Sequence, residues 1–335
     1  MSNIKFKAML VSEIEDKKFS REIVTRQLKD LPKGDVLINV KYSSLNYKDA
    51  LSSIGNRGVT RNYPHTPGID AAGIIVESNN DNFEAGDEVI VTGYDLGMNT
   101  SGGFGEYIRV PAEWVVKLPE NLTLRESMIY GTAGFTAALS VYKLVNSGIK
   151  PDDGNILVTG ATGGVGSTAI SILSKIGYNV IAATGKTHEK DMLLGIGAKD
   201  IVDRREIDDD SGRPLLKARW AGVIDTVGGN MLSTAIKTTN YGGSITCCGN
   251  VADHKFSTSV YPFILKGVTL FGIDSVQCPM DIRLNIWKKL SSDWKPNTLN
   301  DNVNEISLKG LNEKIDMMLD GKHKGRTIVN LSSQQ

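Results

Sequence analysis

Cysteine is scarce in this chain, and its few copies form no recognisable framework. The three cysteines are Cys247, Cys248 and Cys278, and none precedes Cys247. An odd set of this kind predicts no disulfide scaffold and fits a reducing cytoplasm. Because the chain also lacks a Cys-x-x-Cys pair and its four histidines lie far apart, we expect no zinc site and no other bound metal.

Excess charge of one sign and long apolar runs are also missing. The chain has 38 basic and 38 acidic residues and a formal net charge of zero. Nucleic-acid binding draws on concentrated positive charge, so we expect no nucleic-acid partner. The apolar runs are shorter than the roughly 20 residues that cross a bilayer, and no signal-peptide pattern opens the chain, so we expect no membrane segment and a cytoplasmic protein. The acidic run Asp208-Asp209-Asp210 is interpreted as a solvated loop.

The pattern of apolar, glycine and proline residues changes near residue 123 and again near residue 258. Residues 1–122 contain short β-branched runs such as DVLINVKYSS and GDEVIVTGY, separated by Gly and Pro, which predict an antiparallel β-rich domain. Residues 123–257 alternate apolar strands with helices, which predicts parallel βαβ units. From residue 258 the β-rich pattern of residues 1–122 returns. With 335 residues, two domains are expected: one from residues 1–122 and 258–335, and an inserted α/β domain from residues 123–257.

A glycine-rich stretch, ILVTGATGGVGSTAI, joins one of these strands to a helix expected from Val165 to Ile176. Glycine permits a tight turn and lets backbone N–H groups approach a pyrophosphate, and a helix start adds unpaired donors. A flexible turn is the alternative, since Thr162 stands where G-x-G-x-x-G has its second glycine. The strand–loop–helix context favours a dinucleotide site with contacts from Gly160, Thr162, Gly163, Gly164, Val165 and Gly166.

The end of the next strand predicts which dinucleotide is bound. An NAD site usually has an acidic residue there, which holds the ribose 2′-hydroxyl. The segment NVIAATGKTHEK instead has Thr184 and Lys186, and its first acid is Glu189 in the following helix. A hydroxyl and an ammonium group suit a 2′-phosphate. We therefore predict NADPH as the cofactor, with a solvated loop lysine as the alternative for Lys186.

Motifs along nearly the whole chain resemble the medium-chain dehydrogenase/reductase superfamily. They include SSLNYKDAL, PHTPGIDAAGIIVES, GGFGEYIRV, GTAGFTAA, VTGATGGVG, VIDTVGG and PFILKGVTLFGIDSV. SLNYKDAL with GIDSV is similar to the quinone-oxidoreductase-like subgroup that includes acryloyl-CoA reductases. The resemblance implies an α/β protein with a GroES-like β-rich catalytic domain and a Rossmann doubly wound parallel-sheet domain. It also implies a homodimer.

The resemblance departs from the zinc-dependent branch of the superfamily. Zinc alcohol dehydrogenases have a cysteine where this chain has Asn46, and Gly-His-Glu where it has Gly68-Ile69-Asp70. The four-cysteine lobe that holds their structural zinc is missing. Without thiolate or imidazole ligands, Asp70 is a poor basis for a zinc site. The resemblance therefore implies a zinc-free reductase.

The NYKD turn supplies the candidate catalytic residues Tyr47, Asn46 and Asp49. The resemblance places this turn beside the nicotinamide, where the Tyr47 hydroxyl is predicted to orient the substrate or relay a proton, and the Asn46 amide to donate a hydrogen bond. The alternatives are a packed Tyr47 with its hydroxyl bonded to backbone and an Asp49 that caps the following helix. By the same resemblance, Thr136 and Asn250 contact the cofactor.

Without a Lewis acid, an activated alkene is easier to reduce than a simple ketone, because charge spreads onto a conjugated carbonyl oxygen. We therefore predict an NADPH-dependent reductase of α,β-unsaturated thioesters such as acryloyl-CoA. A quinone reductase is the first alternative, and an NADPH-binding structural or sensor protein without turnover is the second. The phosphates of CoA would require cations, for which Arg283 and Lys266 are the candidates, with Arg57 and Arg61 as further possibilities.

Overall fold

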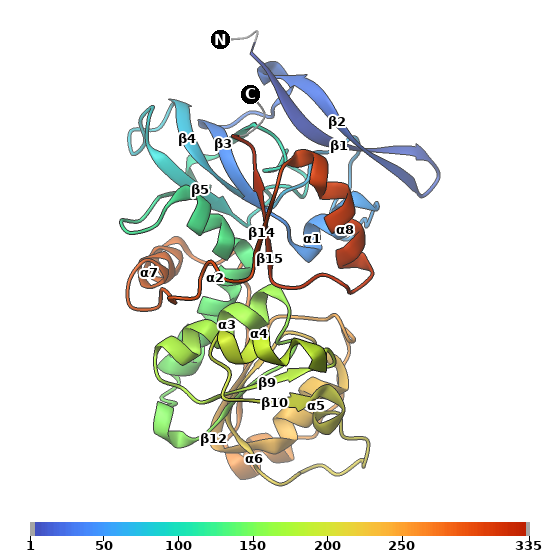
Figure 1. Ribbon diagram of the computed structural model, residues 1–335, viewed down its shortest axis with the longest axis vertical. Coiled ribbons are helices and arrows are strands. Elements are labelled where there is room, and N and C mark those ends of the chain that lie inside the picture. The colour runs from blue at the N-terminus through green and yellow to red at the C-terminus, as the bar shows by residue number, and fades with distance from the viewer. Residues whose placement is uncertain (1–3, 333–335) are drawn as a thin grey trace. The chain divides into compact units, whose positions relative to one another are not determined.

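The computed structural model describes residues 4–332, which divide into two compact units (Figure 1). Unit 1 consists of Met1–Thr132 and Val303–Gln335, and unit 2 is Ala133–Asn302. Helix α2 (Leu124–Asn146) begins in unit 1 and continues in unit 2. Gly131 interrupts it with φ of 50° and ψ of −157°, just before the boundary.

Unit 1 is built on a mainly antiparallel sheet in the order β14-β15-β3-β4-β5-β7, with β6 also paired to β3. Its strands are β3 (Val36–Ser44), β4 (Asp70–Ser78), β5 (Glu88–Thr92), β6 (Tyr107–Val110), β7 (Val115–Lys117), β14 (Val303–Ile306) and β15 (Arg326–Asn330). The helices are α1 (Tyr47–Ser53) and α8 (Leu311–Leu319). A separate hairpin pairs β1 (Lys5–Glu15) with β2 (Lys18–Gln27). The C-terminal strand β15 pairs with β3, so the end of the chain belongs to the sheet of this unit.

Strand β3 has buried apolar side chains on both faces, which suits its central position in the sheet. Val36, Ile38 and Val40 point into the main core of unit 1. Leu37, on the opposite face, packs in a second cluster with Phe6 of the hairpin. A strand that is apolar on both faces must be covered on both, and the hairpin provides the second cover.

Unit 2 is built on a parallel six-stranded sheet in the order β10-β9-β8-β11-β12-β13. Its strands are β8 (Ile156–Val158), β9 (Val180–Thr184), β10 (Asp200–Asp203), β11 (Trp220–Asp225), β12 (Thr239–Cys247) and β13 (Thr269–Gly272). Its helices after α2 are α3 (Gly164–Lys175), α4 (Lys190–Gly195), α5 (Gly229–Thr238), α6 (Tyr261–Lys266) and α7 (Met280–Leu290).

Short 3₁₀ turns occur in both units. They cover Leu28–Asp30, Ala112–Trp114, Pro151–Asp153, Thr187–Glu189, Arg204–Ile207 and Leu308–Gly310.

The strand order of unit 2 reverses direction at β8. From β8 the chain adds β9 and β10 on one side, then crosses back to add β11, β12 and β13 on the other. In a doubly wound sheet the crevice at such a reversal, at the carboxyl ends of the strands, is where ligands bind. The glycine-rich stretch follows β8 directly, so the topology puts it at this position. The predicted α/β fold with a doubly wound sheet is confirmed.

The second boundary between the units lies later than the sequence predicts. We expected residues after 257 to return to the first domain, but unit 2 continues to Asn302. The reason is the pairing of β13, where Thr269 to Gly272 align in parallel with Ser244 to Cys247 of β12. The apolar run VTLFG therefore extends the parallel sheet. The first boundary falls after Thr132, later than the expected residue 122.

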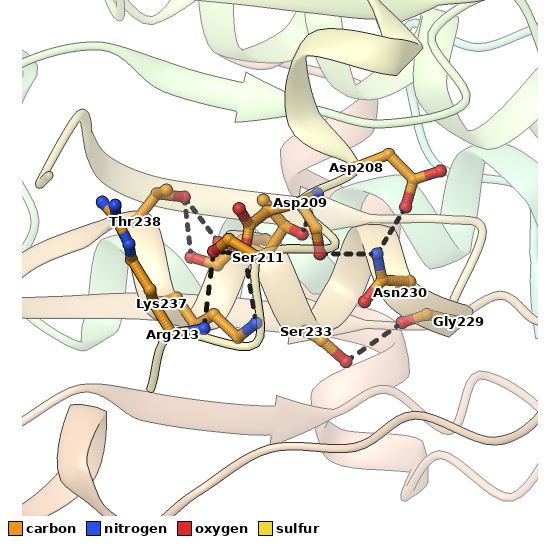
Figure 2. Close-up of polar contacts among 11 residues, drawn as sticks. Asp208, Asp209, Ser211, Arg213, Gly229, Asn230, Ser233, Lys237 and Thr238 are labelled. Carbon is orange, nitrogen blue, oxygen red and sulfur yellow. Dashed lines mark hydrogen bonds and ion pairs between the residues drawn. The ribbon is translucent and has the colours of Figure 1, made fainter. Parts of the chain in front are cut away.

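The acidic run in unit 2 is less free than a solvated loop (Figure 2). The Nδ2 atom of Asn230, on α5, donates to Oδ1 of Asp208 at 2.7 Å and to the carbonyl oxygen of Asp209 at 2.9 Å. The Asp209 carboxylate also lies 3.4 Å from Nζ of Lys237 on the same helix. These contacts attach Asp208 and Asp209 to α5, so a structural role explains the acidic residues at these two positions.

Candidate functional site

Close contacts require glycine in the turn between β8 and α3. Gly160 has a φ of +59°, and a Cβ on it would collide with the hydroxyl oxygen of Thr226. A Cβ on Gly166 would collide with the carbonyl oxygen of Gly160 and lie 2.9 Å from the Cα of Ala161. Side chains at these two glycines would push α3 away from the turn, so glycine keeps the helix start close to the strand end.

The N-terminus of α3 has the donors that an anion requires. Gly163 is the N-cap, and no side chain caps the helix. The first-turn N–H groups, those of Gly164, Val165 and Gly166, have no acceptor within the helix, and the side chain of Thr162 beside them is buried. A 12-residue helix adds a partial positive charge at this end. The turn therefore fits the pyrophosphate of a dinucleotide, and these residues are the ones that would hold it.

A buried carboxylate that the sequence analysis missed supports this turn from the neighbouring strand. Asp225 ends β11, and its Oδ1 accepts the Thr159 hydroxyl at 2.8 Å. Its Oδ2 accepts the N–H of Gly228 at 2.8 Å. Burial raises the pKa of Asp225. The Thr159 hydroxyl in turn accepts the N–H of Thr226 at 2.9 Å, so the ends of β8 and β11 are joined. The run VIDTVGG, an acid between an apolar strand and two glycines, was the available signal.

At the end of β9 the structure places a second cation, Arg204, beside the predicted residues Thr184 and Lys186. The hydroxyl of Thr184 accepts the Lys186 N–H at 2.9 Å. Arg204, which follows the neighbouring strand β10, lies against Gly185, where a Cβ would be 2.8 Å from its Nε. The sequence analysis missed Arg204 because it is distant along the chain. The signal was its position immediately after a parallel strand, since the carboxyl ends of adjacent parallel strands lie together.

The two cofactor contacts implied by resemblance occupy different settings. Thr136, on α2, is buried, and its hydroxyl lies 2.8 Å from that of Ser275. Asn250 is exposed in the segment that follows β12. Both lie within unit 2. Their contacts with the cofactor stay a prediction.

The two cations expected to bind CoA phosphates are engaged elsewhere. Lys266 donates from Nζ to three backbone carbonyls beside the end of α5, those of Leu216 at 3.3 Å, Lys237 at 2.9 Å and Thr239 at 3.2 Å. Arg283 is 1% exposed, and its guanidinium carbon lies 4.8 Å from the centre of the Phe135 ring. Arg283 is buried, and the ammonium group of the half-buried Lys266 is directed at these carbonyl oxygens. This geometry does not favour the predicted phosphate contacts of either residue.

Of the other two arginines considered for this role, Arg57 has a partly engaged side chain. The guanidinium of Arg57 pairs with Glu13 at 2.5 Å and lies 5.1 Å from the centre of the Tyr63 ring. It also donates to the carbonyl oxygen of Arg61 at 2.6 Å. Both arginines are exposed, so they keep the surface that a phosphate contact would need.

In unit 1 the NYKD turn rests on a buried polar cluster centred on Asp70. The Asp70 carboxylate accepts the Ser44 hydroxyl at 2.5 Å and Nδ2 of Asn46 at 2.7 Å. It also accepts the N–H and hydroxyl of Thr132, at 2.8 and 2.6 Å. Arg326, from β15, donates to Ser44 Oγ at 2.9 Å and lies 3.4 Å from Asn46 Oδ1. Arg326 was missed because only the fold brings residue 326 to this turn.

The structure gives Asp49 the capping role that was considered as an alternative. Its Oδ2 accepts the backbone N–H of Asn46 at 2.8 Å, which closes a capping box at the start of α1. Its Oδ1 accepts the N–H groups of Gly68 at 3.1 Å and Ile69 at 2.9 Å. Burial, and then the charge of Asp70, raise the pKa of Asp49 to about 7. Asp49 therefore fixes two backbone segments and is not open to a ligand.

Asn46 and Tyr47 differ in what they can offer a ligand. The Asn46 amide is buried, and its donors are directed at Asp70, Asp49 and the Ser44 carbonyl oxygen. The amide is therefore a donor to the protein itself, and its predicted hydrogen bond to a substrate stays a prediction. Tyr47 begins α1 and is 42% exposed, which speaks against the alternative of a packed tyrosine. Within this turn Tyr47 and the half-buried Lys48 are the side chains that a ligand could reach, and Tyr47 is the more exposed of the two.

The described residues offer neither a cluster of metal ligands nor a membrane-spanning helix. Among residues 4–332, no three or more His, Cys, Asp or Glu side chains come together in a way that would hold a metal ion. None of the helices in that range is long and apolar enough to cross a membrane.

Two protein families match this chain. The alcohol dehydrogenase GroES-like domain family matches residues 32–120, and the zinc-binding dehydrogenase family matches residues 164–292. The first match falls in unit 1 and the second in unit 2.

Individual relatives match the chain over nearly its full length. "Putative quinone oxidoreductase YhfP" of Bacillus subtilis is 47% identical over 93% of this chain and 95% of its own. Its crystal structure with NAD bound has a TM-score of 0.96, with 45% identity over 98% of this chain and 100% of that one. Acrylyl-CoA reductase AcuI of Ruegeria pomeroyi is 40% identical over 98% of this chain and 100% of its own. The YhdH oxidoreductase of Salmonella enterica in complex with NADP has a TM-score of 0.94, with 42% identity over 97% and 99% of the two chains.

Asp49 predicts a pH dependence of stability. Its pKa of about 7 in the folded protein lies above the ordinary 3.8, so between these values the folded state holds a proton that the unfolded chain has released. This contribution to stability is full below the ordinary pKa and is lost as pH rises through about 7. Asp49→Asn removes it, so we expect the unfolding free energy of the wild type to fall relative to that of the variant between about pH 4.5 and 8.

The measurement is urea denaturation of both proteins across this range. Asp152→Asn, which changes an exposed carboxyl group, is the control and should follow the wild type. Asp49→Asn should also be less stable by about 1–3 kcal/mol at low pH, because an amide cannot accept all the N–H groups that the carboxyl group accepts. Parallel pH profiles for the wild type and Asp49→Asn would contradict the prediction.

Proposed function

We propose that this chain, which belongs to the quinone-oxidoreductase-like subgroup of the medium-chain dehydrogenase/reductase superfamily, is an NADPH-dependent reductase of activated alkenes. The proposal depends above all on one observation, the glycine turn at the point where the strand order of unit 2 reverses. At this turn the first-turn N–H groups of α3 are unpaired within the helix. Cβ atoms at Gly160 and Gly166 would collide with their neighbours, so glycine keeps the helix start close to the strand end. Such a turn suits the pyrophosphate of a dinucleotide.

The end of β9 favours NADPH over NADH for this chain. The structure of YhfP contains NAD and that of YhdH contains NADP, so its relatives do not decide the matter. This chain has no acid at the position that binds the ribose 2′-hydroxyl, and Thr184 and Lys186 stand there. Arg204 lies beside them, against Gly185. A planar guanidinium and an ammonium group suit a phosphate dianion.

The polar cluster around Asp70 supports an alkene over a simple ketone as the substrate. Its amide, hydroxyl and guanidinium groups are poor zinc ligands, and the guanidinium of Arg326 places a positive charge where a metal ion would add a second. A bound NADPH would supply a hydride. The protein would then need to hold the conjugated carbonyl oxygen by a hydrogen bond and deliver a proton, and the exposed Tyr47 hydroxyl suits both tasks.

An α,β-unsaturated thioester such as acryloyl-CoA is our first choice of substrate class, and a quinone is the second. The name of AcuI supports the thioester, and that of YhfP supports the quinone. Because Lys266 and Arg283 are engaged within the fold, we no longer propose them as CoA contacts. The exposed Arg57 and Arg61 are the remaining candidates for the CoA phosphates.

We also propose that the protein is a homodimer formed through unit 2. Four neighbouring apolar side chains on and beside α6 are strongly exposed, namely Val260, Tyr261, Ile264 and Leu265. The next strand, β13, is an edge of the parallel sheet. An apolar face beside an open strand edge favours contact with another chain, and in a two-fold dimer the same patch serves both partners.

Cofactor preference tests the assignment of the β9 end. The double variant Lys186→Ala/Arg204→Ala should weaken NADPH binding by on the order of 10–100-fold and leave NADH binding within about twofold, because only NADPH carries the 2′-phosphate. Fluorescence titration with each cofactor measures both constants. Lys175→Ala, at the far end of α3, is the control. Equal affinities of the wild type for NADPH and NADH would refute the preference.

A comparison of substrates tests the reaction. We expect NADPH oxidation with acryloyl-CoA to exceed that with a simple quinone in kcat/KM. Tyr47→Phe should lower kcat for acryloyl-CoA about 100-fold, a typical contribution of a positioned proton donor, and leave NADPH affinity unchanged. A faster reaction with the quinone would favour the second substrate class. NADPH binding without oxidation by any of these acceptors would point to a sensor and contradict the proposed activity.

The assembly is tested by analytical ultracentrifugation. The wild type should sediment as a dimer, and Ile264→Lys/Leu265→Lys should shift it towards a monomer by placing charge in the apolar contact. Ile14→Lys is the matched control, because Ile14 of unit 1 is 63% exposed and Ile264 is 68% exposed. A monomeric wild type would overturn this part of the proposal.

A further inference from the structure

The carboxamide of Asn46 is held between an anion and a cation. Its Nδ2 donates to Oδ2 of Asp70 at 2.7 Å, and Nη1 of Arg326 lies 3.4 Å from its Oδ1. An amide nitrogen only donates and an amide oxygen only accepts. A flipped amide would therefore direct its nitrogen at the guanidinium and its oxygen at the carboxylate. The two charges select one orientation of Asn46.

Arg326 supplies the positive charge of a cluster that contains two buried carboxyl groups. Asp49, Asp70 and Arg326 are all buried. Burial lowers the pKa of Arg326, while the charges of Asp70 and Asp49 act in the opposite direction. A guanidinium stays charged in proteins, and removing one partner of a buried charged cluster leaves an uncompensated charge. The Ser44 hydroxyl accepts from Arg326 at 2.9 Å and donates to Asp70 at 2.5 Å, so it connects the two charges.

The remaining donors of Arg326 join separate segments of unit 1. Its Nε donates to the carbonyl oxygen of Ile129 on α2 at 2.7 Å, and its Nη1 lies 3.5 Å from the carbonyl oxygen of Leu45. A Cβ on Gly131, where α2 is interrupted, would lie 2.8 Å from Nη2 of Arg326 and collide with Ser44 and Asp70. The guanidinium is thus surrounded by β3, α1 and α2, and each of its three nitrogens has an acceptor.

The orientation of Asn46 is transmitted to Tyr47 through the start of α1. Asn46 is the N-cap of that helix, and Tyr47 is its first residue. A shift of the cap would change the direction in which the Tyr47 side chain leaves the helix, because a side chain's direction follows its backbone. Among residues 4–332 the Tyr47 hydroxyl has no hydrogen-bond partner that would correct such a shift. The cap is therefore the part of the structure that aims the hydroxyl.

We propose that Arg326 is a positioning residue of this reductase, which acts with Asp70 to hold Asn46 in one orientation and so aims the Tyr47 hydroxyl at the substrate. The inference rests on the proposed function, since it gives Tyr47 a role in that reaction. It extends the function by a residue in the last strand of the chain that does not itself touch the substrate. The planar fork of the guanidinium is required, because one ammonium group cannot reach Ile129, Ser44 and Asn46 together.

The test is a double-mutant cycle between Arg326→Lys and Tyr47→Phe, with kcat for acryloyl-CoA and the NADPH dissociation constant measured for each protein. Arg326→Lys keeps the charge, and we expect it to lower kcat about tenfold and leave NADPH affinity unchanged. In the Tyr47→Phe background the same exchange should change kcat by less than about twofold, because the group that Arg326 positions is already absent. Arg125→Lys, which alters an ion pair with Glu305 at 2.8 Å elsewhere in unit 1, is the matched control and should have wild-type kcat in both backgrounds.

The outcomes separate this inference from the proposed function. A tenfold loss of kcat in both backgrounds would mean a general structural effect and would overturn the inference, while the reductase activity stands. Unchanged kcat in Arg326→Lys would overturn it as well. A wild type that oxidises NADPH with neither acryloyl-CoA nor quinone would overturn both. Should Arg326→Lys fail to fold, Asn46→Ala in the same cycle with Tyr47→Phe removes the positioned cap directly, and additive losses there would overturn the inference.

Discussion

A carboxyl group buried away from water must receive hydrogen bonds from the protein, and unit 1 is arranged around one such group. Asp70 accepts from Ser44 at the end of β3, from Asn46 at the start of α1 and from Thr132 on α2. An unsatisfied charge at this depth would cost several kcal/mol, so these three segments are fixed relative to one another. The same requirement places Arg326 opposite and leaves no room for a side chain at Gly131.

In unit 2 the buried carboxyl group of Asp225 also receives its hydrogen bonds from the protein, and it too lies beside a candidate site. Its acceptor atoms are used by the Thr159 hydroxyl and the Gly228 N–H, so the strand end beside the glycine turn is fixed. In both units the groups that we propose to face a ligand, namely the first-turn N–H groups of α3 and the Tyr47 hydroxyl, lie next to buried carboxyl groups that accept several hydrogen bonds from the protein. A site built this way is positioned before the ligand arrives, which reduces the cost of binding.

Local patterns in the sequence predicted the features that depend on local physics. The glycine turn, the helix after it and the missing acid after β9 are each read from a few adjacent residues. The features that failed depend on pairing between distant residues. The register of β13 with β12 could not be foreseen from VTLFG, because an apolar run does not specify its partner strand. Nor could the burial of Arg283 against Phe135, since an arginine in a helix is usually exposed. Arg204 and Arg326 reach their sites only through the fold.

The position of Arg326 also limits the chemistry that the neighbouring turn can perform. A metal ion would bind a carbonyl oxygen directly and stabilise an alkoxide that carries its charge on one atom. A guanidinium whose three nitrogens already have acceptors in Ile129, Ser44 and Asn46 cannot do so. In the proposed reaction, stabilisation of the developing charge is therefore left to a hydroxyl such as that of Tyr47, which is a weaker partner. Such a site suits substrates in which conjugation spreads the charge, as in an enone, a thioester enolate or a quinone, and it suits simple ketones poorly.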